Sequence, residues 1–314
     1  MNGSARLERV IYIASVAYSG STLLDMLMGS HAQVTSLGEV QLLARYARNG
    51  SPCTCGAAVS ACPFWNQVDA ALRGRLGDRF PGLGDFPLDV ETKGRGTFRW
   101  LPSVTDLSLV IGSRGLWDRV AAWHRRSGLS KQAAENKLAL FETIAELRDT
   151  PFVVDSSKYP LTAKATYLAA PERVRIVHLV RDGRAVTLSL MRRQGLTLEQ
   201  AARRWTRFNW NLRLVLSTVG PERRFFVRYE DLCADPDATL RRLTEFVGAD
   251  PAFRPLLLEK ESFHNIGGNP MRFRRTEVHI KLDERWRRDL SPDQLRVFDR
   301  FGGRTNRRLG YRDP

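Results

Sequence analysis

The sequence lacks any apolar run long enough to cross a membrane. No stretch of its 314 residues approaches the roughly 18 consecutive apolar residues that a spanning helix needs. The first nine residues are polar, and the apolar run that follows, from Val10 to Ala17, is short and leads into a glycine turn. No signal peptide is evident from this pattern. We therefore expect a soluble, cytoplasmic protein without a membrane span.

Acidic residues are also scarce relative to basic ones. The chain has 34 Asp and Glu against 49 Lys and Arg, a net charge of +15. Such a field attracts nucleic acid, anionic lipid or small polyanions, and composition does not choose among them. The arginines are spread along the chain instead of gathered in one tail, which argues against a nucleic-acid-binding arm. We expect no nucleic-acid partner.

Cysteine is rare, and three of the four cysteines lie close together. Cys53, Cys55 and Cys62 fall within "CTCGAAVSACPFW", and Cys233 stands apart. Three clustered thiols can bind zinc or form a disulfide. The usual Cys-x2-Cys pattern is absent and no fourth ligand is evident, although His31 and Cys233 are candidates. A reducing cytosol argues against an obligatory disulfide. We interpret this segment as a compact loop with free thiols, with a metal site and a local disulfide as alternatives.

Short apolar runs alternate with amphipathic stretches along the chain. The runs that predict buried strands are 9–16, 152–155, 173–180 and 224–229, and the stretches that predict helices include 38–48, 131–148 and 198–216. This alternation is typical of an α/β fold with a central parallel sheet flanked by helices. In such sheets, ligands bind at the carboxyl ends of the strands. We expect a single domain over 1–314 with a variable, acceptor-side insertion at about 45–130.

The stretch "SVAYSGSTLL" at 15–24 has the layout of a phosphate-binding loop. A helix N-terminus offers free N–H groups and the positive end of the helix dipole. Ser19, Ser21 and Thr22 add hydroxyls, and Gly20 allows close approach of the backbone to an anion. A helix capped by Ser or Thr is the simpler alternative. The first glycine and the lysine of a Walker loop are missing, which disfavours a nucleoside triphosphatase.

Two further strand ends carry basic residues. Arg181 ends the strand in "HLVRDGRAVTLSLMRR", and Ser189 follows eight residues later, about two helical turns on. The planar guanidinium of arginine suits phosphate because it donates two parallel, charge-assisted hydrogen bonds. Lys158 follows the strand in "VVDSSKYP". A basic surface turn and a solvated lysine are the alternatives to an anion site.

These three segments, in this order, resemble the sulfotransferases that use 3′-phosphoadenosine-5′-phosphosulfate (PAPS). The nearest subfamily is similar to the tyrosylprotein and carbohydrate sulfotransferases and their bacterial relatives. The loop at 15–24 matches their 5′-phosphosulfate loop, and Arg181 and Ser189 match the segment that grips the 3′-phosphate. The resemblance implies a P-loop-like, nucleotide-binding sulfotransferase fold, with PAPS as sulfuryl donor and no metal required.

The resemblance also implies a role for individual residues. Glu39, in "SHAQVTSLGEVQLL", matches the general base, and Lys158 matches the lysine that steadies the sulfuryl group and the leaving phosphate. Tyr18 stands where the family has a basic residue. The positions that the resemblance assigns to the cofactor are Tyr18, Ser19, Gly20, Ser21, Thr22, Arg181, Ser189, Arg193, Tyr229, Gly267, Gly268, Asn269, Arg272 and Lys281.

The expected reaction is transfer of a sulfuryl group to a hydroxyl of a carbohydrate, glycolipid, phenolic or other small-molecule acceptor. A P-loop-like kinase or nucleotide-binding module is the alternative, and a protein that binds nucleic acid through its basic surface is a third. We expect the acceptor pocket within 45–130, including the cysteine loop. Its tryptophans, Trp65, Trp100, Trp117 and Trp123, could stack on a sugar or an aryl group, but tryptophans at this spacing are more often core residues. The oligomeric state is open.

Overall fold

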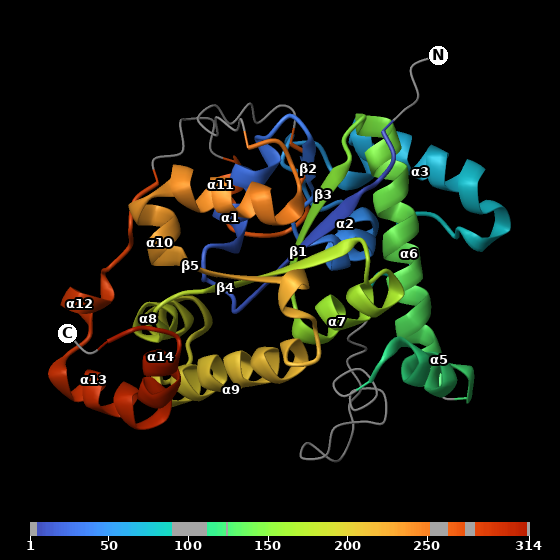
Figure 1. Ribbon diagram of the computed structural model, residues 1–314. Helices are drawn as coiled ribbons and strands as arrows, with labels where there is room; N and C mark the ends of the chain where they lie inside the picture. Colours follow the sequence, from blue (N-terminus) through green and yellow to red (C-terminus); the bar gives the residue numbers. More distant parts are fainter. Residues whose placement is uncertain (1–4, 90–111, 124, 252–262, 274–279, 313–314) are drawn as a thin grey trace.

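A five-stranded parallel sheet forms the centre of the molecule (Figure 1). The computed structural model describes residues 5–89, 112–123, 125–251, 263–273 and 280–312. The strand order is β2-β3-β1-β4-β5, and every pair is parallel. The strands are β1 (Arg9–Ser15), β2 (Val34–Ser36), β3 (Phe152–Lys158), β4 (Val174–Val180) and β5 (Arg224–Arg228). The predicted α/β class with a central parallel sheet is confirmed.

Both faces of the sheet are covered, which is why its central strands read as continuous apolar runs. In β1, Ile11 and Ile13 face the apolar side chains of α1 (Ser21–Gly29), α10 (Tyr229–Ala234) and α11 (Pro236–Val247). Val10 and Tyr12 face the opposite way, toward α6 (Arg125–Arg148), α7 (Pro160–Ala169) and α9 (Leu198–Leu216). Figure 1 shows α1, α10 and α11 on one side of the sheet and α7 and α9 on the other.

The remaining helices extend this layered core. They are α2 (Leu43–Arg48), α3 (Pro63–Leu76), α5 (Arg114–Trp123), α8 (Gly183–Gln194), α12 (Trp286–Asp289), α13 (Pro292–Phe298) and α14 (Arg304–Arg308). The helix expected over 38–48 is split into a 3-10 turn, Val40–Leu42, and α2. The helix expected over 131–148 begins earlier, at Arg125. None of the helices in these described ranges is both long and apolar enough to cross a membrane.

The expected acceptor-side insertion packs partly into the core. The side chains of Trp65, on α3, and Trp117, on α5, are 0% and 1% exposed. They are therefore core residues and have no free face for an acceptor ring. Trp100 and the side chain of Trp123 lie outside the described residues. That the chain forms one domain with an insertion at 45–130 stays a prediction.

The strand order indicates where a ligand would bind, at the carboxyl ends of the central strands. The chain winds from β1 toward β2 and β3 on one side, then crosses to β4 and β5 on the other. The loops that follow β1, β3 and β4 therefore meet outside the carboxyl ends of neighbouring strands. These loops carry the three segments that the sequence analysis singled out.

Candidate active site

The loop after β1 is built around an uncapped helix start. Gly20 is the N-cap of α1 with φ of +90°, and no side chain in the described part of the chain caps the N–H groups of the first turn. These groups, together with the helix dipole, form an anion-binding end. The hydroxyl of Ser19 is buried and has no hydrogen-bond partner among the described residues. A polar ligand bound at this loop would satisfy both the buried, unpartnered hydroxyl and the N–H groups.

Tyr18 ties this loop to Arg181 through its backbone. Its φ of +69° is unusual for a bulky residue. Its carbonyl accepts a hydrogen bond from Arg181 Nη1 at 3.0 Å, and its hydroxyl accepts one from Gln194 Nε2 at 3.2 Å. Tyr18 thus supplies no charge, but it brings the guanidinium of Arg181 against the loop where the family has a basic side chain.

Glu39 and Lys158, the two predicted catalytic residues, form an ion pair between Glu39 Oε1 and Lys158 Nζ. Their side chains are 15% and 13% exposed, so the pair is largely shielded from solvent. Lys158 ends β3 with φ of +76°. Strained backbone of this kind is often found at functional sites. The structure therefore brings together two residues that are 119 positions apart in the sequence.

A glycine turn joins this ion pair to the loop after β1. Glu39 donates its N–H to the carbonyl of Ile266 at 2.6 Å. A Cβ at Gly267 would lie 3.0 Å from that of Glu39, and one at Gly268 would lie 2.8 Å from Thr22 Oγ1. The N–H of Asn269 donates to Thr22 Oγ1 at 3.0 Å. The residues from Ile266 to Asn269 belong to the segment 263–273, which we call the late loop. The late loop therefore contacts the predicted base on one side and the predicted phosphosulfate loop on the other.

Arg181, Ser189 and Arg193 line one small cavity of about 120 Å³. Arg192 and Arg285 line it too, and neither was predicted from the sequence. Arg192 directly precedes Arg193, so it could have been found as part of the same basic pair. Four arginines around one cavity suit a phosphate group, as the resemblance implies for this segment.

Arg181 itself is held by an acidic partner and an aromatic ring. Its Nη2 pairs with Asp283 Oδ2 at 3.1 Å, and its guanidinium lies 4.6 Å above the centroid of the Tyr229 ring. Hydrogen bonds from Arg285 and Arg181 hold the pKa of the Asp283 carboxyl well below its usual range. Tyr229 also packs against Gly20, where a Cβ would overlap its ring, and burial raises the pKa of its hydroxyl.

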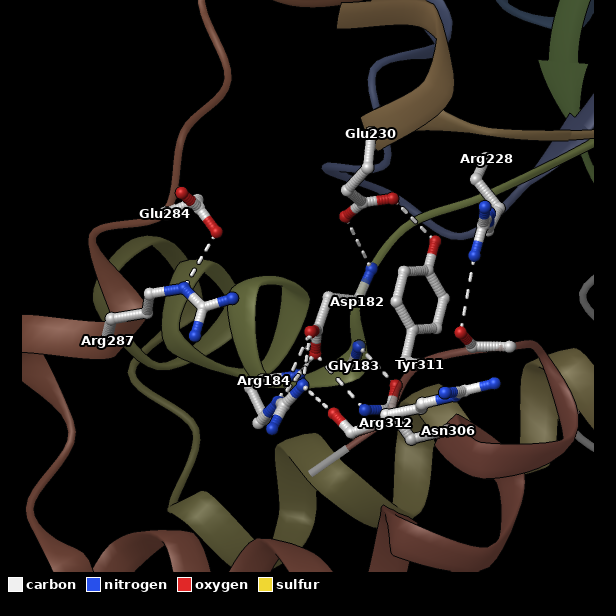
Figure 2. A network of polar contacts seen from close by, with 11 residues as sticks. Asp182, Gly183, Arg184, Arg228, Glu230, Glu284, Arg287, Asn306, Tyr311 and Arg312 are labelled. Carbon is white, nitrogen blue, oxygen red and sulfur yellow. Dashed lines mark hydrogen bonds and ion pairs between the residues drawn. The ribbon is translucent and has the colours of Figure 1, made fainter. Parts of the chain in front are cut away.

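Figure 2 shows the polar network that fixes the turn after Arg181. Asp182 caps α8 by accepting from Arg184 N at 2.9 Å, and it also pairs with the Arg184 guanidinium. Glu230 accepts from Asp182 N at 3.0 Å and from the Tyr311 hydroxyl at 2.6 Å. Asn306 accepts from Gly183 N at 2.9 Å. Residues near the C-terminus therefore position the turn from which Arg181 projects.

Two of the predicted cofactor residues are placed differently from the rest. Arg272 is buried and donates to the carbonyls of Asn265 at 2.6 Å and Pro52 at 3.2 Å, so it faces the cysteine loop. Lys281 is exposed, and its carbonyl accepts from the Tyr229 hydroxyl at 3.3 Å. Their roles at the nucleotide stay predictions.

Two buried charged residues support the site and were missed from the sequence. Lys137 Nζ pairs with Asp155 Oδ2 at 2.7 Å with both side chains fully buried. Asp155 also binds the hydroxyl of Ser157, which in turn accepts from Gln41 N at 3.1 Å, beside Glu39. Lys137 lies on the same helical stripe as Ala134, Leu138 and Phe141. Its place on this core-facing stripe could have indicated from the sequence that the lysine is buried.

Asp25 is the second buried residue near the site that was missed from the sequence. It lies on α1, fully buried, and its Oδ2 accepts from Ser36 Oγ at 2.8 Å and from Asn265 Nδ2 at 2.6 Å. Burial raises its pKa to about 7. The apolar neighbours of Asp25 in "STLLDMLMG" were the only hint of its burial.

Comparison with known proteins finds similarity to sulfotransferases. Residues 117–253 match the model of the sulfotransferase family. The sulfotransferase domain of the Synechococcus PCC 7002 olefin synthase superposes with a TM-score of 0.52 at 19% identity, covering 99% of this chain and 97% of that one. That likeness supports the sulfotransferase fold. No curated protein matches.

Two other solved structures are similar over their whole length. The sulfotransferase domain from the curacin biosynthetic pathway has a TM-score of 0.49 at 20% identity and covers 99% of this chain and 100% of that one. A sulfotransferase from Alicyclobacillus acidocaldarius has a TM-score of 0.41 at 14% identity, with 98% of each chain covered. The family-model match over residues 117–253 and the shared fold agree with the resemblance of the three segments to the PAPS-dependent sulfotransferases.

Proposed function

We propose that the protein transfers the sulfuryl group of PAPS to a hydroxyl of a small-molecule or glycan acceptor, with Glu39 as the general base. Carbohydrates, glycolipids and phenols are the acceptor classes we expect. One observation carries the proposal: the Glu39–Lys158 ion pair lies beside the glycine turn that contacts Thr22. A carboxylate, a lysine and an uncapped helix start thus meet at one edge of the sheet.

This arrangement suits an in-line displacement at sulfur. The acceptor oxygen forms a bond to sulfur, its proton passes to the Glu39 carboxylate, and the bond to the bridging oxygen breaks. Negative charge then grows on the leaving 5′-phosphate. The free N–H groups of α1 and the ammonium of Lys158 stabilise that charge more in the transition state than in the ground state.

The cavity next to Arg181 accounts for the other end of the donor. Ser189, Arg193 and Arg181 line it, and we assign it to the 3′-phosphate. Asp283 now engages Arg181, so an incoming phosphate exchanges one anionic partner of this arginine for another. The ring of Tyr229, packed on Gly20 and under Arg181, is placed to contact the nucleotide between its two phosphate ends.

Titration with 3′-phosphoadenosine-5′-phosphate (PAP), the spent donor, tests this assignment. We expect the wild type to bind PAP and Arg181→Ala to bind it at least about tenfold more weakly, since a lost charge-assisted hydrogen bond costs roughly 1.5–3 kcal/mol. Arg241→Ala removes an exposed arginine on α11 and serves as the control, with unchanged affinity. If the wild type fails to bind PAP, the proposal is wrong.

A further inference from the structure

Four potential metal ligands converge between the cysteine loop and the late loop. Cys53, Cys55, Cys62 and His264 place their ligand atoms within 4.8 Å of one another. Cys53 and Cys62 are buried. His264 lies 202 residues beyond Cys62 in the sequence, so only the fold brings it to the thiols.

His31 and Cys233, the two residues considered as a fourth ligand from the sequence, do not join this cluster. His31 Nε2 lies 2.9 Å from the carbonyl of Asp250, and its Nδ1 accepts from Gln33 N at 3.0 Å. Cys233 lies beside Tyr229, at the nucleotide end of the site. The fourth group is His264, which could not be predicted from the sequence because it lies so far from the cysteines along the chain.

Three of the six distances among the four ligand atoms are close to the edges of a zinc tetrahedron, and all six are within 4.8 Å. With Zn–S near 2.3 Å and Zn–N near 2.0–2.1 Å, tetrahedral angles put two sulfurs about 3.8 Å apart and a sulfur and a nitrogen about 3.6 Å apart. The Sγ atoms of Cys55 and Cys62 are 3.6 Å apart. His264 Nδ1 lies 3.3 Å from Cys62 Sγ and 3.7 Å from Cys53 Sγ.

Further contacts hold Cys53 and His264 in place. Within the loop, Cys53 N donates to the carbonyl of Ala57 at 2.8 Å, and Gly56 N donates to that of Cys53 at 2.9 Å. Phe64 stacks on the His264 imidazole with centroids 4.7 Å apart, and Trp65 Nε1 donates to the His264 carbonyl at 3.1 Å. The ligands are thus oriented by the fold, as in metal sites whose surroundings fix the ligand geometry.

The alternatives explain fewer of these contacts. A disulfide between Cys55 and Cys62 needs an S–S distance of about 2.0 Å and leaves Cys53 and His264 without a reason to converge. Free thiols need no imidazole facing them. Three thiols and one imidazole at tetrahedral spacing are a donor set typical of structural zinc.

We propose that Cys53, Cys55, Cys62 and His264 bind one Zn²⁺ as a closed, four-coordinate structural site. Four protein ligands leave no open position for a substrate, so the ion serves stability instead of the transfer reaction. It ties the loop at 53–62 to the segment that continues through Asn265 to Gly268. That segment reaches Asp25, Glu39 and Thr22, so the ion holds the glycine turn against both catalytic segments.

Metal analysis of the purified full-length protein tests the site. We expect about one equivalent of zinc per chain, and replacement by Co²⁺ should give the visible bands of a tetrahedral ion and a thiolate charge-transfer band. His264→Ala and Cys62→Ser should lose the metal, while His264→Cys should keep it because a fourth thiolate completes the tetrahedron. Cys233→Ser, a cysteine outside the cluster, is the matched control and should retain full zinc content.

Two results would overturn the site. One is wild-type protein that holds no zinc after incubation with excess ZnCl₂ under reducing conditions. The other is a Cys55–Cys62 disulfide found by mass mapping of protein alkylated without reductant. Removal of zinc with a chelator should also lower the melting temperature of the wild type, because the ion binds only the folded chain. Since these measurements do not depend on PAP, they stand or fall separately from the proposed reaction.

Discussion

At the scale of single residues, the Glu39–Lys158 ion pair makes the sharpest prediction. Glu39→Gln keeps the size and hydrogen-bonding reach of the side chain but cannot take the acceptor proton. We expect kcat to fall by about 10²–10⁴-fold, the usual contribution of a general base, while the affinity for PAP stays nearly unchanged. Steady-state kinetics with an acceptor in hand, together with PAP titration, separates the two effects.

Glu199→Gln provides the control for this variant. Glu199 is an exposed residue at the start of α9 and forms a surface ion pair with Arg203, so its loss should leave kcat intact. Full activity in Glu39→Gln would remove Glu39 as the base and leave the sulfotransferase assignment untouched.

Asp25 predicts how stability responds to pH. Its pKa rises to about 7 in the folded protein because of burial, whereas the unfolded chain titrates near the ordinary value of about 4. Between these values the folded state holds a proton that the unfolded state has released, so stability falls as pH rises toward 7. In Asp25→Asn this loss is absent. From pH 5 to pH 8, the free energy of unfolding of the wild type should drop by about 2 kcal/mol more than that of the variant, measured by urea denaturation.

Candidate site residues that stand in local motifs could be proposed from the sequence, whereas partners that meet across the chain could not. Gly20, Arg181 and Ser189 stand in short motifs at strand ends, where parallel-sheet geometry alone says that ligands bind. His264 and Lys137 find their partners only after folding, because Cys62 and Asp155 lie on other elements. Tyr18 shows a third case, since its contribution is made by a carbonyl that no side-chain motif reveals.

At the scale of elements, the strand-to-helix turn at Gly20 forms the predicted binding loop. Its φ of +90° is costly for any residue with a Cβ, and a Cβ there would also overlap the Tyr229 ring. Gly20→Ala should therefore lower stability by more than the roughly 1–2 kcal/mol that a left-handed conformation alone costs. It should also weaken PAP binding strongly, because the loop and the Tyr229 ring must separate.

Gly195→Ala isolates the backbone part of that effect. Gly195 ends α8 with φ of +64°, and no atom of the described residues lies within 4 Å of a Cβ built there. We expect this variant to lose only the stability that a residue with a Cβ loses in a left-handed conformation. It should bind PAP normally. Equal effects of the two substitutions on PAP binding would contradict the close packing of Tyr229 on the loop.

The helices and strands could be predicted from the periodicity of apolar residues wherever those residues are strongly buried. The strands β1, β3, β4 and β5 coincide with the apolar runs, and α9 matches the predicted helix because its apolar stripe and its Thr197 capping box agree. The helix expected over 38–48 was wrong in its first turn. There the N–H of Glu39 donates to the carbonyl of Ile266 and the N–H of Gln41 donates to the Ser157 hydroxyl, which are tertiary contacts that local propensity does not contain.

At the scale of the whole molecule, the excess of positive charge predicts how the donor arrives. A field of this sign raises the encounter rate with a polyanion, and salt screens it. Arg193 is exposed, and among the described residues it forms no ion pair, so its charge at the cavity is available to an incoming phosphate. The association rate of PAP should therefore fall as ionic strength rises toward 0.15 M, where the Debye length is about 8 Å, while its dissociation rate changes much less.

Stopped-flow measurements on two charge variants locate the source of this steering. Arg193→Gln should slow PAP association and flatten its salt dependence. Arg79→Gln removes an exposed arginine in the turn after α3, which lies at the far end of the molecule from α8 in Figure 1, and should change neither quantity appreciably. If both variants behave alike, the steering field belongs to the net charge as a whole. A local effect at Arg193 would instead mean that the cavity beside Arg181 concentrates the field at the place where the 3′-phosphate is proposed to bind.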